Sequence, residues 1–232
     1  MQTAFEDGFE EKVEQFFNKF NTKRLYNKKE VIIRADDDPL GVFYLKEGYA
    51  RLYTVSPTGQ ELTLNIFKPG AYFSLMWAIG ETKNTYFFEA LTKIELLRAP
   101  KEALVEFVKE EPQVLFEMTK RILIGLDGLL GVMESLMFGN AYNKVATVLI
   151  VAAKRFGKKE ESGQVIIDLP LTHQFIATLA GLTRETTSLV VKEFEKKGII
   201  HCQRPFFVIG QMKSLEKEAA LSRQQQAHPY VL

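Results

Sequence analysis

The hydrophobic pattern of the chain changes its period near residue 100, and this change restricts the fold more than any other feature. Before it, short runs rich in β-branched and aromatic residues recur about every 10–12 residues, separated by turn sequences such as Ser56-Pro57-Thr58-Gly59 and Lys68-Pro69-Gly70. Regularly spaced short strands of this kind are typical of an all-β barrel or sandwich. After it, apolar residues follow helical spacing. The sequence therefore predicts an α+β protein with a β-rich N-terminal half and a helical C-terminal half.

A heptad pattern runs through the predicted helix of residues 112–139. Its apolar members alternate in steps of four and three, with Thr119 as the polar member of the series: Leu115, Ile122, Leu126, Leu129, Met133 and Leu136. A second copy of the same helix is the simplest cover for such a seam, which predicts a two-fold symmetric homodimer. The alternative is that the seam packs on the chain's own barrel. Gly139-Asn140 ends this helix and is the expected hinge.

Residues 171–200 have the spacing of a helix-turn-helix. Thr172 is the predicted N-cap of a helix through Ala180, Gly181 provides the turn, and Thr183 is the predicted cap of a second helix through Lys197. Strand-like sequences on both sides predict a winged form, with the wing around Arg204-Pro205. In DNA-binding proteins of this type the second helix enters the major groove.

The exposed start of that second helix holds the residues expected to contact bases, because Arg suits guanine and Glu suits cytosine: Arg184, Glu185, Thr187 and Ser188. Phosphate contacts are expected from a second set of polar residues: Thr172, His173, Gln174, Thr183 and Arg204. Residues 1–139 carry 17 basic and 21 acidic side chains, whereas residues 140–232 carry 13 and 8. This asymmetry favours contact of the second half with a polyanion, and double-stranded DNA is the expected partner.

Several of these segments resemble the Crp/Fnr family of transcription regulators. The most specific are Gln174-Phe175-Ile176-Ala177, residues 181–188 and residues 195–200, and weaker ones are residues 44–48, 58–62 and 68–70. The resemblance covers about residues 25–215. It implies a β-roll sensor domain similar to a cyclic-nucleotide-binding barrel over residues 1–111, a dimerisation helix and hinge over 112–139, and a winged helix-turn-helix domain over 140–232. It also implies a transcription regulator with RNA polymerase as its protein partner.

Two departures from the family pattern change the expected ligands. Members that bind cyclic nucleotides carry Gly-Glu and Arg-Ser pairs, where this chain has Ser74-Leu75 and Asn84-Thr85. Without that carboxylate and guanidinium, cyclic nucleotide binding in the family's usual mode is not expected. Members that read a GA step place an Arg where this chain has Leu189. Because Arg184 and Glu185 remain, the expected half-site resembles TGTGA. The change to Leu189 predicts a relaxed contact at one base pair.

The barrel contains an aromatic group that predicts either an apolar effector site or ordinary core: Tyr72, Phe73, Trp77, Tyr86, Phe87 and Phe88. No cofactor is expected. The single cysteine, Cys202, cannot hold an iron–sulfur cluster and is predicted to be a small buried residue. The three histidines all lie in the second half, so haem is not expected in the barrel. Glu61 and Glu89 are interpreted as solvated strand residues.

The chain shows no catalytic motif and is not expected to be an enzyme. Its start lacks a secretory signal, and no apolar run is long enough to span a bilayer, so a cytoplasmic protein is expected. The competing hypothesis is an effector-binding module that acts through protein contacts without binding DNA. That module would show no salt-dependent binding to duplex DNA.

Overall fold

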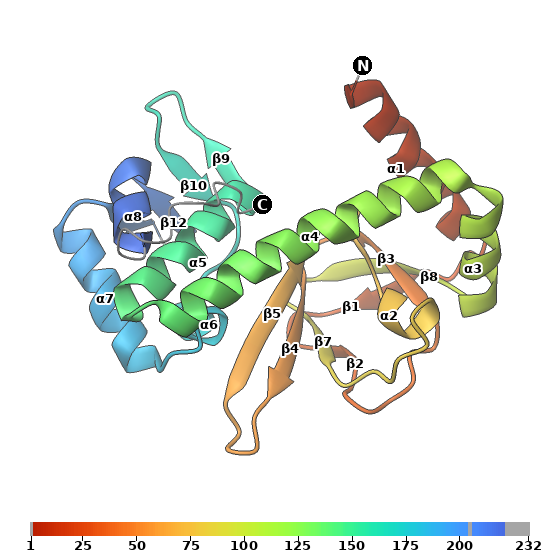
Figure 1. The fold of residues 1–232 in the computed structure, drawn as a ribbon, viewed down its shortest axis with the longest axis horizontal. Coiled ribbons are helices and arrows are strands. Elements are labelled where there is room, and N and C mark those ends of the chain that lie inside the picture. The colour runs from red at the N-terminus through yellow and green to blue at the C-terminus, as the bar shows by residue number, and fades with distance from the viewer. Residues whose placement is uncertain (1, 204–205, 221–232) are drawn as a thin grey trace. The chain divides into compact units, whose positions relative to one another are not determined.

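The computed structural model describes residues 2–203 and 206–220, with side chains from residue 8 onward. It divides into two compact units, Met1–Arg121 and Ile122–Leu232. Helix α4 (Pro112–Phe138) begins in the first unit and ends in the second (Figure 1). The division into domains at residues 111 and 139 stays a prediction.

Two antiparallel four-stranded sheets build the N-terminal unit (Figure 1). The first has the order β1 (Arg24–Tyr26), β8 (Ile94–Ala99), β3 (Val42–Glu47) and β6 (Tyr72–Phe73). The second has the order β2 (Val31–Ile33), β7 (Phe87–Ala90), β4 (Ala50–Val55) and β5 (Glu61–Phe67). Gly48 turns the chain from β3 into β4 with a φ of 81°, and a Cβ there would lie 2.3 Å from the carbonyl oxygen of Lys93. Glycine is therefore required at this turn.

The strands of the first sheet separate two hydrophobic clusters, because successive side chains point to opposite faces. Phe43 and Leu45 belong to the cluster between the sheets. Val42 and Tyr44 belong to the cluster formed with α1 (Gln2–Asn18), α3 (Lys101–Glu110) and the start of α4. The short helix α2 (Leu75–Ala78) contributes to this second cluster.

Charged contacts reinforce the packing of α1. Arg121 of α4 donates to Glu10 at 3.0 Å and lies over the ring of Phe9, with 4.4 Å from Cζ to the ring centroid. Lys12 contacts Glu111 at 2.7 Å. These pairs are exposed, so each contributes on the order of 1 kcal/mol or less, and apolar burial provides most of the stabilisation of this helix.

The C-terminal unit consists of α5 (Ala141–Phe156), a helix-turn-helix and a small antiparallel sheet. The sheet has the order β11 (Ile200–Gln203), β12 (Phe206–Ile209), β10 (Val165–Ile167) and β9 (Gly157–Lys159). Asn140 caps α5: its side chain accepts from the N–H groups of Tyr142 and Asn143, and the Asn143 side chain accepts from the N–H of Asn140. The Asn143 amide also donates to the carbonyl oxygen of Glu218, which joins α8 (Met212–Ala219) to the start of α5. The predicted α+β fold is confirmed.

Candidate nucleic-acid interface

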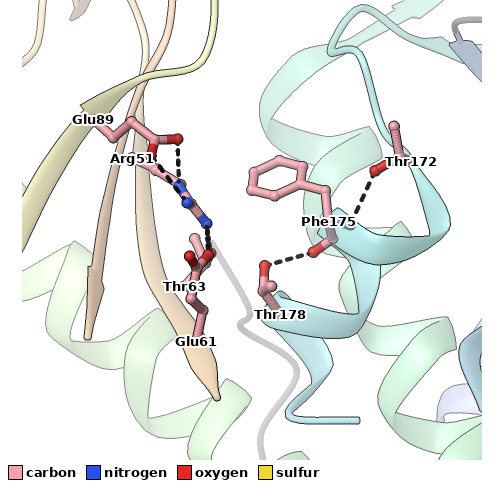
Figure 2. A network of polar contacts seen from close by, with 7 residues as sticks. All are labelled: Arg51, Glu61, Thr63, Glu89, Thr172, Phe175 and Thr178. Atoms are coloured by element: carbon pink, nitrogen blue, oxygen red, sulfur yellow. Dashed lines mark hydrogen bonds and ion pairs between the residues drawn. The ribbon is translucent and has the colours of Figure 1, made fainter. Parts of the chain in front are cut away.

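The first helix of the helix-turn-helix is α6 (His173–Ala180), and both of its ends are fixed by local chemistry. The hydroxyl of Thr172 accepts from the N–H of Phe175 at 3.0 Å, and the hydroxyl of Thr178 donates to the carbonyl oxygen of Phe175 at 2.8 Å (Figure 2). Gly181 ends the helix in the left-handed region with a φ of 62°. A residue without Cβ is favoured at that position, which explains why the chain turns there.

The second helix is α7 (Arg184–Lys196), which begins at the cap Thr183. The Thr183 hydroxyl accepts from the N–H of Thr186 at 3.2 Å. Three apolar residues of the opposite face are fully or almost fully buried: Val190, Val191 and Phe194. The first N–H groups of an α-helix have no partner within the helix and lie at the positive end of its dipole, so the amino end of α7 is suited to phosphate.

Arg184 and Glu185 are exposed on α7, as predicted for residues that contact bases. Ser188 is half-buried and lines a shallow surface hollow with Arg184, Glu185 and Leu189. The expectation for Thr187 is wrong: its side chain is completely buried, and its hydroxyl has no hydrogen-bond partner among the described residues. Thr187 lies three residues before Val190 and four before Val191, so the helix turns it toward the packed face.

The candidate phosphate contacts lie on two elements. Thr172, Gln174 and Thr183 are exposed, although both threonine hydroxyls already accept a capping N–H. His173 is half-buried, with its ring centroid 6.2 Å from that of Phe207. Arg204 lies outside the described residues. Of the described residues in this set that do not act as caps, Gln174 is exposed and His173 is half-buried.

Comparison with known proteins gives the same two parts in the same order. Residues 23–111 match the model of a cyclic nucleotide-binding domain, and residues 143–218 match a Crp-like helix-turn-helix domain. The chain is 30% identical over 179 residues to the transcriptional regulator SdrP of Thermus thermophilus, covering 77% of this chain and 83% of that protein. It is 25% identical over 201 residues to the global nitrogen regulator of Nostoc sp., covering 86% of this chain and 87% of that protein.

Among solved structures, the chain resembles a transcriptional regulator of the CRP/FNR family from Thermus thermophilus. The TM-score is 0.66 at 26% identity, over 85% of this chain and 97% of that chain. The chain belongs to the Crp/Fnr family of transcription regulators. As a Crp/Fnr protein it carries a DNA-binding helix-turn-helix domain.

The two positions at which this Crp/Fnr regulator lacks charged residues serve local structure instead. Ser74 has a φ of 74° and precedes α2, while Leu75 begins that helix. Asn84 is 9% exposed, and its amide donates to the carbonyl oxygens of Arg34 at 2.8 Å and Tyr86 at 3.0 Å. The Asn84 side chain therefore ties two loops of the barrel together. That cyclic nucleotide is not bound in the family's usual mode stays a prediction.

Five of the six aromatic residues proposed for an effector site are divided between two clusters, and the sixth, Phe87, stacks on Tyr53 instead. Phe73 and Phe88 are buried between the sheets, with ring centroids 5.0 Å apart, and Tyr86 packs against them. Tyr72 and Trp77 pack against the other cluster, on the helical side of the first sheet. Tyr72 and Phe73 lie on different faces because they are successive residues of β6. Core packing accounts for Phe73 and Phe88.

A buried charge network in the second sheet was not predicted from the sequence. Arg51 of β4 pairs with Glu89 of β7 at 3.1 and 3.3 Å and with Glu61 of β5 at 2.8 Å, and it contacts Thr63 (Figure 2). Burial lowers the pKa of Arg51, but hydrogen bonding and charge from Glu89 and Glu61 raise it above its ordinary value. The interpretation of Glu89 as solvated is therefore wrong, since its side chain is only 15% exposed. The signal in the sequence is an Arg inside an apolar strand, but its partners depend on strand register.

Three further observations concern predicted absences and Cys202. Cys202 is exposed on β11, which is an edge strand of its sheet, so the prediction that it is buried is wrong. Within the described ranges, no group of three or more His, Cys, Asp or Glu side chains is placed to hold a metal ion. No helix in the described part of the chain is long and apolar enough to cross a membrane.

Proposed function

We propose that this Crp/Fnr regulator acts as a homodimer that places α7 of each copy in the major groove of a palindromic operator. The observation that carries the proposal is the exposure of Arg184 and Glu185 at the capped amino end of α7, on the face opposite Val190 and Phe194. Side chains in that position reach base edges when the helix lies in the groove. The helix is fixed from behind by its buried face, so its exposed face is presented rigidly.

The homodimer is supported by the exposed apolar surface of α4. Five seam residues are 42–52% exposed in the single chain: Leu115, Ile122, Leu126, Leu129 and Met133. Leu136, the sixth, is half-buried. Further large apolar residues of the same helix are also exposed, among them Phe116, Leu123 and Leu130. A continuous apolar surface of this kind is rarely left open to water, and a second α4 covers a heptad seam by two-fold symmetry.

Each exposed polar side chain at the start of α7 has a defined base preference. The Arg184 guanidinium can donate two hydrogen bonds to O6 and N7 of guanine, and the Glu185 carboxylate can accept from N4 of cytosine. A half-site similar to TGTGA contains two G·C pairs, each of which presents a guanine on one strand and a cytosine on the other. Thr172, Gln174 and Thr183 would contact phosphates and set the register of the protein on the duplex.

The decisive experiment is selection of bound duplexes from a random pool with the full chain. We expect a palindromic consensus whose half-sites are about one DNA turn (roughly 34 Å) apart. Arg184→Ala should relax the consensus at one base pair and weaken binding by about 1–3 kcal/mol. Arg24→Ala, which removes an exposed arginine of β1, is the matched control and should leave the consensus unchanged. Retention of the full base preference by Arg184→Ala would contradict the assigned readout.

Salt dependence and oligomeric state separate this proposal from the alternative of a module that acts only through protein contacts. The logarithm of the binding constant for duplex DNA should fall linearly with the logarithm of the salt concentration, whereas that module would bind no duplex. Sedimentation should show a dimer for the wild-type chain and a monomer for Leu126→Lys. Repeating the selection with metabolites extracted from cells tests for an effector, and adding RNA polymerase tests for the expected protein partner.

A further inference from the structure

Helix α7 exposes one large apolar residue that the readout above does not use. Among the residues of α7, all of which lie in the described part of the chain, Leu189 is the single large apolar side chain that is exposed, at 69%. Singly exposed leucines are ordinary on protein surfaces, and Leu40 is another in this chain. Leu189 differs from Leu40 in its neighbours, because it shares a surface hollow with Arg184, Glu185 and Ser188.

Helical geometry places Leu189 on the side of α7 that faces away from the protein. Successive residues are about 100° apart around an α-helix, so Ser188, Glu185 and Leu189 lie at about 40°, 100° and 140° from Arg184. On the same scale the buried residues Val190, Phe194 and Thr187 lie at about 240°, 280° and 300°. Leu189 therefore belongs to the exposed face and lies about 40° beyond Glu185.

The position of Leu189 along the helix fixes the region of DNA that it can contact. It is four residues after Glu185, which corresponds to a rise of about 6 Å. That distance is on the order of one to two base-pair steps of about 3.4 Å. A duplex that receives Arg184 and Glu185 thus brings a neighbouring base pair against Leu189.

We infer that Leu189 contacts the 5-methyl group of a thymine in each half-site and thereby selects thymine at that position. The inference rests on the proposed function. The thymine methyl is the apolar group that a base pair presents in the major groove, and apolar side chains recognise it by direct contact. A leucine offers no hydrogen bond to the polar edges of guanine, adenine or cytosine. Contact with a methyl group also removes from water the side chain that the free protein leaves exposed.

The test replaces each thymine of the selected operator, one position at a time, by deoxyuridine. This substitution removes only the 5-methyl group and leaves the hydrogen-bonding edges intact. Dissociation constants of the full chain are measured by fluorescence anisotropy. One thymine per half-site should respond, with binding about four-fold weaker for each methyl removed, which is the fold-change expected for one buried carbon group.

Protein variants assign the effect to Leu189 through a double-mutant cycle. Leu189→Ala should bind the thymine and uracil duplexes equally, whereas Leu189→Met should keep part of the difference. Leu40→Ala is the matched control, and it should keep the full four-fold difference. A selected half-site in which no thymine responds, or a four-fold difference that survives in Leu189→Ala, would overturn the inference while leaving the proposed function intact. A pool that yields no enriched duplex would instead refute the proposed function, and the inference with it.

Discussion

The two carboxylate partners of the buried Arg51 guanidinium differ sharply in exposure, and this difference predicts how much stability each one contributes. The side chains of Arg51 and Glu89 are 8% and 15% exposed, while that of Glu61 is 40% exposed. Removing one partner of a buried pair leaves a charge without compensation, whereas an exposed pair is already screened by water. Glu89→Gln should therefore destabilise the protein far more than Glu61→Gln does.

The expected magnitudes follow from these contacts. Complete loss of a buried partner costs about 3–5 kcal/mol. In Glu89→Gln the amide oxygen can still accept from Arg51, and Glu61 remains at 2.8 Å, so we expect a loss of about 2–3 kcal/mol. Glu61→Gln should cost about 0–1 kcal/mol. With a urea dependence of about 1–3 kcal/mol/M, the first variant should shift the unfolding midpoint by about 1 M.

Urea unfolding followed by tryptophan fluorescence is the appropriate assay. Trp77 is the only tryptophan of the chain, and it lies in α2 of the same unit as Arg51. The double variant Arg51→Met/Glu89→Met is the matched control, because it replaces the pair by apolar groups of similar length. It should lie within about 1 kcal/mol of the wild type. Equal losses for Glu89→Gln and Glu61→Gln would refute the argument from burial.

Three further predictions concern other parts of the chain. Tyr72 has a buried hydroxyl without a hydrogen-bond partner among the described residues, so Tyr72→Phe should raise the free energy of unfolding by about 1 kcal/mol near neutral pH. Burial also raises the pKa of Tyr72 to about 12. The free energy of unfolding of the wild type should therefore fall as the pH rises from 10 through 12, because the unfolded chain loses the Tyr72 proton first. In Tyr72→Phe this fall should be shallower when urea unfolding is repeated over that range. Asn140→Ala removes the reciprocal cap of α5 and should cost about 1–2 kcal/mol in thermal unfolding followed by circular dichroism, whereas an unchanged midpoint would contradict the role of the cap. Leu129→Lys should dissociate the proposed dimer and weaken operator binding in a gel-shift assay, and a dimer that survives this charge would refute the seam.

Signals that act within a few residues were the ones from which the fold could be predicted. Thr172, Gly181 and Thr183 bound the two helices of the helix-turn-helix because a cap hydroxyl or a left-handed turn acts on the backbone beside it. The heptad pattern likewise located α4, since helical spacing is visible in one segment. The family resemblance then gave the order of the parts.

Features that depend on packing between distant segments were missed or mistaken. The partners of Arg51 follow from the register of β4 with its neighbours, and no local pattern defines that register. Thr187 was expected among the exposed residues at the start of the second helix, yet its place on the helix turns it inward. The aromatic residues of the barrel were grouped by closeness in sequence, whereas alternation along the strands separates them.

The exposed thiol of Cys202 has a practical consequence. As the chain's one cysteine, it accepts a single maleimide dye at a defined place on β11, with no competing site to remove. Because Trp77 reports only on the other unit, the two optical signals follow the two halves of the molecule separately. A titration with operator DNA would then show in one sample which half responds and whether the response spreads to the other. The same thiol can link two molecules when oxidised, so such titrations require a reducing agent before labelling.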